Sequence, residues 1–318
     1  MDPSGDFCGV ILAAGRGERL KPLSFSVPKP LLPVCNTPII QYQVEAMCSL
    51  GISEIFIVVG HLSHLIIDHF GNGDRFGVRI RYVHQEKPLG IAHAVAQLEP
   101  HIERPFIVFL GDIFMVTRNL EQMITMFRAR KAGAVLAVKR ETEPEFIKRN
   151  FTVLLDAGGQ VRKVVEKPRF VTSMLKGCGI YLFDLPVFDA IRQTPRTAMR
   201  DEYEITTSIQ ILVNDGYPVF PAEVVDWDMN VTVPCDLLTC NIWQLKAMAK
   251  RSLIGDGAVI HPNAEIEGSV IGPGVVVEQP IHIRDSVVLA GSVLTNREDL
   301  QQALVTPDAL ISCQRRTP

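Results

Sequence analysis

The stretch FCGVILAAGRG, residues 7–17, decides the fold class of this chain. It opens with an apolar run and continues into glycines, which predicts a buried β-strand that ends in a loop. Residues 54–59 (EIFIVV) and 106–110 (FIVFL) repeat this pattern, and a glycine follows each of them. Helical patterns separate these runs, at residues 38–50, 62–70, 90–98 and 120–131. Buried strands that alternate with helices predict a doubly wound, mixed but mostly parallel α/β sheet.

In a sheet of this kind, ligands bind beyond the carboxyl ends of the strands. The loops AAGRG, VVGH, HQEKPLG and GDIF are therefore the candidate binding loops. After about residue 140, shorter apolar runs predict antiparallel strands, and helical patterns follow at residues 201–214 and 236–250. We expect this second part to complete one domain that spans residues 1–250.

A third pattern begins near residue 253, where apolar residues recur every six positions. The two sets are separated by a slip of one residue: Ile254, Ile260, Ile266, and then Ile271, Val277, Ile283, with Val288 and Val293 following. This period predicts a short left-handed β-helix of about two coils over residues 251–298. A short helical piece (REDLQQAL, 297–304) is expected at the start of the final segment, and residues 299–318 are assigned to a C-terminal tail.

Composition narrows the class of protein. The 318 residues carry a net charge of −3 and no long cationic run, so we expect no nucleic-acid partner. No apolar run reaches the roughly 18 residues of a membrane span, and the first residues do not resemble a signal peptide. The seven cysteines are widely spaced and form no CxxC pair, which favours reduced thiols and a cytoplasmic protein.

The first loop continues as LAAGRGERLKP (residues 12–22), with PKP at 28–30. Taken alone, the glycines fit either a tight turn or a phosphate loop, and they match neither a Walker A loop nor a dinucleotide fingerprint. The full string resembles GxGTRLxP…PKP, the signature of the Rossmann-like sugar-1-phosphate nucleotidyltransferases. The resemblance implies that Arg19 grips the triphosphate and that Lys29 lies on the reacting phosphates. It also implies a nucleotide-binding role for four loop residues: Leu12, Ala14, Gly15 and Gly17.

Further segments extend the resemblance. QEKPLGIAHA (85–94) looks like the base-reading segment of the long-form thymidylyltransferases, which assigns Gln85 and Gly90 to the nucleobase. VEKP (165–168) is similar to the sugar-phosphate segment, which assigns Glu166 and Lys167 to the sugar phosphate. CGIYLF (178–183) is similar to the strand beside the sugar, which assigns Gly179 to that pocket.

The resemblance also implies a Mg²⁺ site. Asp112 follows an apolar strand, and a carboxylate there suits a metal that prefers oxygen ligands. The position of the second family aspartate is Asn230, and Asp228 lies nearby as a substitute. Two other departures stand out: Glu18 replaces a Thr or Ser, and the FT pair at 151–152 stands where the family has a glycine against the sugar.

The predicted reaction joins an NTP to a sugar 1-phosphate and releases pyrophosphate, with Mg²⁺ as cofactor. The long-form likeness favours dTTP or UTP with glucose 1-phosphate, and GTP with mannose 1-phosphate is the alternative. A homologue without activity, which binds nucleotide or nucleotide sugar and regulates a partner, is the competing hypothesis. We expect a homo-oligomer without membrane contact, since short β-helices often mediate assembly.

Overall fold

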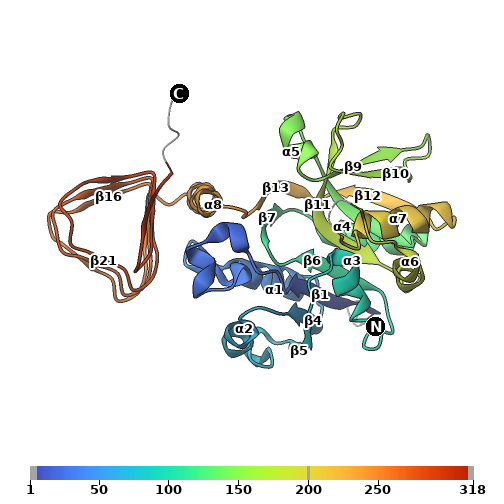
Figure 1. The fold of residues 1–318 in the computed structure, drawn as a ribbon, viewed down its shortest axis with the longest axis horizontal. Coiled ribbons are helices and arrows are strands. Elements are labelled where there is room, and N and C mark those ends of the chain that lie inside the picture. The colour runs from blue at the N-terminus through green and yellow to red at the C-terminus, as the bar shows by residue number, and fades with distance from the viewer. Residues whose placement is uncertain (1–5, 199–200, 314–318) are drawn as a thin grey trace. The chain divides into compact units, whose positions relative to one another are not determined.

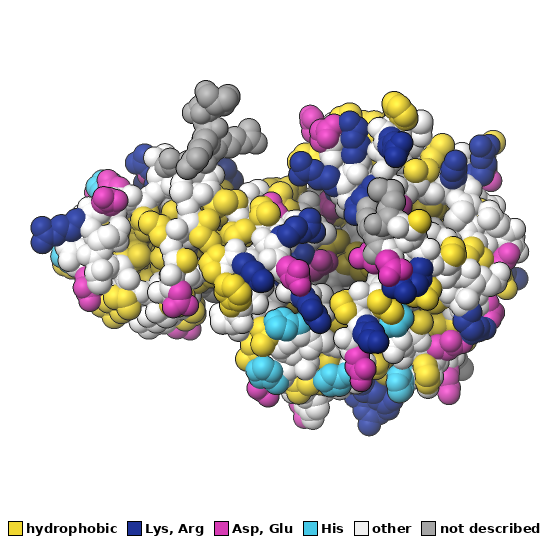
Figure 2. All heavy atoms as spheres, in the orientation of Figure 1, with side chains coloured by type: hydrophobic (Ala, Val, Ile, Leu, Met, Phe, Trp, Pro, Cys, Tyr) yellow, Lys and Arg dark blue, Asp and Glu magenta, His cyan; other side chains and the backbone are white. Residues whose placement is uncertain are grey.

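The computed structural model describes residues 6–198 and 201–313, and the chain divides into two compact units (Figure 1). The first unit contains Met1–Gly15 and Gln43–Asp228, and the second contains Arg16–Tyr42 and Met229–Pro318. On the face drawn in Figure 2, the Lys and Arg side chains are interspersed with Asp and Glu.

The first unit is built on a nine-stranded sheet. Its parallel part has the order β6-β1-β4-β5 and consists of β6 (Phe106–Leu110), β1 (Cys8–Ala13), β4 (Glu54–Val59) and β5 (Arg79–His84). The strands β1, β4 and β6 are buried almost throughout, because neighbouring strands and helices cover their apolar side chains. The predicted mixed α/β sheet is confirmed.

The remaining strands of this sheet are arranged around β11 (Leu175–Phe183), which is buried along its whole length. It runs antiparallel to β6, β8 (Ala134–Arg140) and β9 (Phe151–Leu155), with a bulge between Gly177 and Tyr181. The sheet is completed by β10 (Val161–Glu166), antiparallel to β9, and by β12 (Val219–Glu223), parallel to β8. A separate two-stranded ribbon joins β7 (Ile113–Thr117) to β13 (Val225–Asn230).

Helices pack on this sheet through its apolar side chains. The helices α3, α6 and α7 contact one another, and α4 contacts β8, β11 and β12. Their bounds are α1 (Ile39–Ser49), α2 (Ser63–Phe70), α3 (Ile91–Ala96), α4 (Glu121–Arg130), α5 (Pro144–Lys148), α6 (Val187–Gln193) and α7 (Ile205–Asn214). Each lies within or close to a range that the sequence patterns predict, apart from the short α5 and α6.

The second unit contains a small hairpin, one long helix and a stack of short strands. The hairpin pairs β2 (Pro33–Val34) with β3 (Thr37–Pro38), and the helix is α8 (Pro234–Ala247). Among residues 6–198 and 201–313, no helix is long and apolar enough to span a membrane.

The short strands form three parallel sheets, as a hexapeptide β-helix requires. The first sheet contains β14 (Leu253–Ile254), β17 (Val270–Ile271), β20 (Val287–Val288), β23 (Ala303–Val305) and the antiparallel β24 (Leu310–Ser312). The second contains β15 (Val259–Ile260), β18 (Val276–Val277) and β21 (Val293–Leu294). The third contains β16 (Glu265–Glu267), β19 (His282–Arg284) and β22 (Leu300–Gln301).

Three expectations about this stack were wrong. It has three full coils, and its strands continue to Ser312, so the predicted helix REDLQQAL is instead β22 and the start of β23. Strand pairing overrides the local helical pattern there, because Leu300 and Leu304 are buried against the preceding coil. Val293 is 54% exposed, and its neighbour Leu294 takes the inward position. The domain bounds at residues 250 and 298 stay a prediction.

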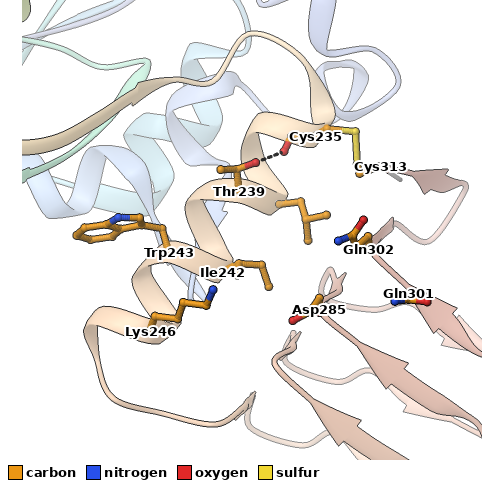
Figure 3. A pocket seen from close by; sticks show the side chains of 10 residues that line it. Cys235, Thr239, Ile242, Trp243, Lys246, Asp285, Gln301, Gln302 and Cys313 are labelled. Atoms are coloured by element: carbon orange, nitrogen blue, oxygen red, sulfur yellow. Dashed lines mark hydrogen bonds between the residues drawn. A yellow bond between two sulfur atoms is a disulfide. The ribbon is translucent and has the colours of Figure 1, made fainter. Parts of the chain in front are cut away.

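The expectation that all cysteines are reduced was also wrong. Cys235, in the first turn of α8, forms a disulfide with Cys313, 78 residues later. The antiparallel turn into β24 returns the chain to α8, and spacing in the sequence could not show this. The disulfide borders a groove of about 790 Å³ between α8 and the coils (Figure 3), where Ile242 faces Asp285 and Gln302.

Candidate functional site

Several predicted nucleotide-binding residues of the first unit lie at one edge of the sheet. Leu12 is the last residue but one of β1. Gln85 directly follows β5, and Asp112 lies two residues after the end of β6. Because these strands are parallel, their carboxyl ends meet at the same edge. The backbones are close there: a Cβ added to Gly60 would lie 2.8 Å from Ala14 O, and one added to Gly111 would lie 2.7 Å from Leu12 O.

Gln85 is buried and its amide is held by a histidine that the sequence analysis did not select. Gln85 Nε2 lies 2.8 Å from His93 Nδ1. An amide nitrogen donates, so Nδ1 is the acceptor in this contact, which a neutral imidazole with its proton on Nε2 allows. Burial lowers the pKa of His93, and the nearby charge of Arg196 lowers it further. The only signal for His93 in the sequence is its position eight residues after Gln85, within a segment that is predicted to be a helix.

Gly90 is required for the packing of the chain itself. Its φ is +106°, and an added Cβ would lie 2.5 Å from Tyr203 O. Two backbone hydrogen bonds fix this approach, Tyr203 N to Leu89 O and Ala92 N to Tyr203 O. The Tyr203 ring also stacks on His93. The closeness of Tyr203 explains the glycine at this position without reference to a nucleobase.

Asp112 sits in a turn that a buried side chain of α1 holds on both sides. Gln43 Nε2 donates to Leu110 O at 2.9 Å and to Ile113 O at 3.1 Å. Among residues 6–198 and 201–313, no three His, Cys, Asp or Glu side chains converge on a metal position. Mg²⁺ commonly takes only one or two carboxylates from the protein, with the remaining ligands from phosphate and water, so Asp112 fits such a site.

The predicted sugar-phosphate residues lie at the end of β10. Lys167 has a left-handed backbone (φ +42°), and its N–H donates to Asn150 O at 2.7 Å. Its Nζ lies 4.0 Å from Glu166 Oε1, and the Lys167 side chain is 42% exposed. Burial raises the pKa of Tyr181, and the nearby Glu166, Cys178 and Asp112 raise it further.

The FT pair at 151–152, which stands where the family has a glycine, places an aromatic ring over Gly177. Phe151 is buried and stacks on Tyr181. Its ring covers Gly177, where an added Cβ would collide with it. Thr152 points elsewhere, since its Oγ1 donates to Ser173 O and Leu175 O. The predicted Gly179 has φ +74° and borders Ile113, so it is also a packing position.

Asp228 is engaged in a buried ion pair. Lys176 Nζ lies 2.6 Å from both of its carboxylate oxygens, and the two side chains are 3% and 4% exposed. Lys139 Nζ lies 3.5 Å from the same carboxylate and 3.0 Å from Glu141 Oε2. Because Lys176 contacts both carboxylate oxygens, we do not propose Asp228 as a metal ligand.

The second unit holds the other predicted residues. Arg19 is exposed in a short turn that follows Gly17 (φ +62°). Lys29 is only 8% exposed, and its Nζ donates to Asn230 Oδ1 at 2.8 Å. The structure therefore brings together a predicted phosphate lysine and a predicted metal ligand. The acceptor of this bond is a neutral amide.

Family membership follows from comparison with known proteins. The sequence model of the nucleotidyl transferase family matches residues 8–229. The chain belongs to this family. A second model, the GlmU-like C-terminal hexapeptide, matches residues 239–315.

Relatives of this nucleotidyltransferase carry different substrate names. A glucose-1-phosphate thymidylyltransferase of Streptomyces griseus is 38% identical over 66% of this chain, which spans 58% of that relative. The UTP–glucose-1-phosphate uridylyltransferase AglF of Haloferax volcanii is 32% identical over 71% of this chain and 92% of its own. A Bacillus anthracis structure described as a glucose-1-phosphate thymidylyltransferase in complex with sucrose superposes with a TM-score of 0.67. It is 28% identical and covers 74% of this chain and 94% of its own.

Proposed function

We propose that this nucleotidyltransferase joins dTTP or UTP to glucose 1-phosphate and releases pyrophosphate. The observation that carries the proposal is the placement of Leu12, Gln85 and Asp112 at one edge of a parallel sheet in a chain of this family. The proposal extends the general family activity, sugar-1-phosphate nucleotidyl transfer, to particular substrates.

The proposed chemistry is an in-line displacement at phosphorus. A phosphate oxygen of the sugar 1-phosphate attacks the α-phosphorus of the NTP, and the bond between the α-phosphorus and its bridge to the β-phosphate breaks. No general base is needed, because the attacking oxygen is already anionic. Arg19 is assigned to the leaving pyrophosphate, and Lys29 and Lys167 are assigned to the reacting phosphates. Such cations stabilise charge that develops in the transition state.

Base choice is assigned to the Gln85 carbonyl. His93 holds the amide nitrogen, so Gln85 Oε1 is the atom that presents itself as an acceptor. Thymine and uracil offer an N3–H donor to such an acceptor, and guanine offers N1–H. Cytosine and adenine carry an acceptor at the corresponding ring position. The geometry thus supports dTTP or UTP, keeps GTP as the alternative, and disfavours CTP and ATP. Gly90 is assigned to the backbone beside the base.

Asp112 and Asn230 are each assigned as a residue that would bind Mg²⁺, and nucleotide phosphates would supply further ligands. When bound, it supplies positive charge that neutralises the phosphates. Asn230 offers an amide oxygen in place of a carboxylate, so the protein contributes one full negative charge. We therefore propose a metal that binds with the nucleotide and only weakly without it.

The test is pyrophosphate release with Mg²⁺ over five NTPs and a panel of hexose and hexosamine 1-phosphates. Signal with dTTP or UTP and glucose 1-phosphate supports the proposal, and signal with GTP and mannose 1-phosphate would replace it. Silence from folded protein that a nucleotide still stabilises thermally would favour the regulatory homologue. Phe151 above Gly177 makes a sugar smaller than glucose the first extension of the panel.

We also propose a homo-oligomer that uses the open end of the coil stack. Ile254 is 51% exposed, whereas Ile271 and Val288, its equivalents in the next coils, are fully buried. A repeat without a polar cap is expected to be covered by a partner. Light scattering that gives the mass of one chain would reject this. A cytoplasmic location stays a prediction, and the disulfide stands against it, since disulfides persist in oxidising compartments.

A further inference from the structure

We propose that Asn241, on α8, is the positioning residue that sets Lys29 against Asn230 through the hairpin β2–β3. The inference rests on the proposed function in one respect: it assumes that Lys29 binds the reacting phosphates. All of the residues concerned belong to the second unit.

Asn241 has no solvent exposure and its side-chain amide is fully engaged. Its Oδ1 accepts from Cys35 N at 2.7 Å, and its Nδ2 donates to Pro33 O at 3.0 Å and to Leu237 O at 2.9 Å. The amide thus ties two backbone groups of the hairpin to α8. A buried amide that fixes backbone groups in this way specifies one position of the loop, because every alternative leaves polar atoms unpaired.

The hairpin needs this support, because its turn is unfavourable for its sequence. Cys35 and Asn36 both have left-handed backbones, with φ of 48° and 64°. A two-residue turn with two positive φ values favours Asn-Gly, and a cysteine at the first position is disfavoured by its Cβ. Asn241 holds Cys35, and Asn36 Nδ2 donates to Ile271 O in the coil stack at 3.0 Å.

The hairpin is connected to Lys29 by a short, hydrogen-bonded segment. Lys29 begins a single 3₁₀ turn, and Leu32 N donates back to Lys29 O at 3.1 Å. Pro33 follows directly. A shift of the hairpin therefore moves the Lys29 backbone as well.

The partner of Lys29 is fixed to the same helix. Asn230 lies four residues before α8, and the carboxylate of Asp236, in the first turn, accepts from Thr232 N and Val233 N at 2.7 and 2.8 Å. α8 thus carries both ends of the 2.8 Å contact between Lys29 Nζ and Asn230 Oδ1. Removing the Asn241 amide releases the Lys29 end alone.

The experiment compares Asn241→Leu, which keeps the branched shape but cannot hydrogen-bond, with Thr239→Val as control. Thr239 lies on α8 at the groove, and its hydroxyl donates only to Cys235 O among the contacts drawn in Figure 3. We expect kcat for pyrophosphate release to fall about ten- to a hundredfold in Asn241→Leu, the cost of a displacement near 1 Å. Adding Cys35→Gly should recover part of the loss, since glycine adopts the turn without support.

A second readout does not depend on activity. The acylation rate of Lys29, followed by peptide mass spectrometry, should rise several-fold in Asn241→Leu and stay unchanged in Thr239→Val. The proposal is overturned if Asn241→Leu lowers the melting temperature while kcat per folded molecule and Lys29 acylation stay at wild-type values. It is also overturned if Cys35→Gly restores nothing. A wild-type enzyme silent in pyrophosphate release would reject the proposed function, and the acylation comparison would still decide the role of Asn241.

Discussion

The buried ion pair of Lys176 and Asp228 predicts an unequal loss of stability when either partner is removed. Removing one partner of a buried pair costs about 3–5 kcal/mol, because the other charge is left uncompensated. In Lys176→Met, Lys139 still lies 3.5 Å from the Asp228 carboxylate, so we expect a loss near 3 kcal/mol. In Asp228→Asn, two lysines remain with Glu141 as their carboxylate, so we expect a loss near 5 kcal/mol.

These losses convert to melting temperatures that can be measured. For a folding unit of 150–250 residues, 1 kcal/mol shifts the midpoint by roughly 2–4 °C. We therefore expect a fall of roughly 6–12 °C for Lys176→Met and roughly 10–20 °C for Asp228→Asn. Circular dichroism or a dye-binding melt at neutral pH measures both. The double change Lys176→Met with Asp228→Leu removes both charges and should recover much of the loss.

The matched control is an exposed pair whose carboxylate, Asp226, lies on β13 with Asp228. Arg118 lies 3.1 Å from Asp226, but these side chains are 62% and 43% exposed. Exposed pairs are worth at most about 1 kcal/mol, so Arg118→Ala should change the midpoint by under about 4 °C. If Lys176→Met and Asp228→Asn shift the midpoint no further than Arg118→Ala, the buried ion pair does not stabilise the folded state more than an exposed pair does.

Three other predictions concern the site and the second unit. The pKa of His93 is lowered by burial and by Arg196, so its neutral form is stabilised; as pH falls through that pKa, Nδ1 gains a proton and loses the Gln85 bond. Affinity for the preferred nucleotide should therefore fall as the pH is lowered through the depressed pKa of His93, and His93→Gln should flatten this profile in a binding titration. Asp112→Asn should raise the Mg²⁺ needed for half-maximal rate at least about tenfold, and an unchanged Mg²⁺ titration would argue against a metal ligand. Reducing the Cys235–Cys313 disulfide, with its separation of 78 residues, should destabilise the second unit by up to about 4.5 kcal/mol, seen as a reductant-dependent midpoint.

The parallel part of the sheet could be predicted because its signal is local. The runs at 54–59 and 106–110 are strands with those bounds, since burial on both faces demands continuous apolar residues. The slip of one residue in the hexads was also real: Ile254 pairs with Ile271 and Ile271 with Val288, so each coil has 17 residues. The third coil was missed because Leu300 and Leu304 lie in a segment with helical spacing.

The sequence selects candidate site residues by motif, but it does not show which partners from distant segments contact them. Lys29 and Asp112 stood out by motif. The meeting of Lys29 with Asn230 joins residues 201 apart, and the support of the hairpin by Asn241 joins residues 206 apart. Asp228 was predicted as a possible metal ligand, and the contact of Lys176, 52 residues away, with both of its oxygens had no signal in the sequence. Charge pairing of this kind leaves no periodicity in the sequence.

The 17-residue coil makes the length of this stack adjustable in whole steps. Ser269 and Ser286 occupy equivalent places, where the backbone N–H of Ser286 donates to Ser269 Oγ and that of Ala303 donates to Ser286 Oγ. A tandem duplication of one coil would meet the same side chains above and below it, so every new contact would already exist in the chain. A duplication or loss of one residue would turn inward valines toward solvent, and one of six residues would keep their phase but shift them to a different sheet of the coil. Insertions and deletions in this region should therefore be tolerated best when their length is a multiple of one 17-residue coil.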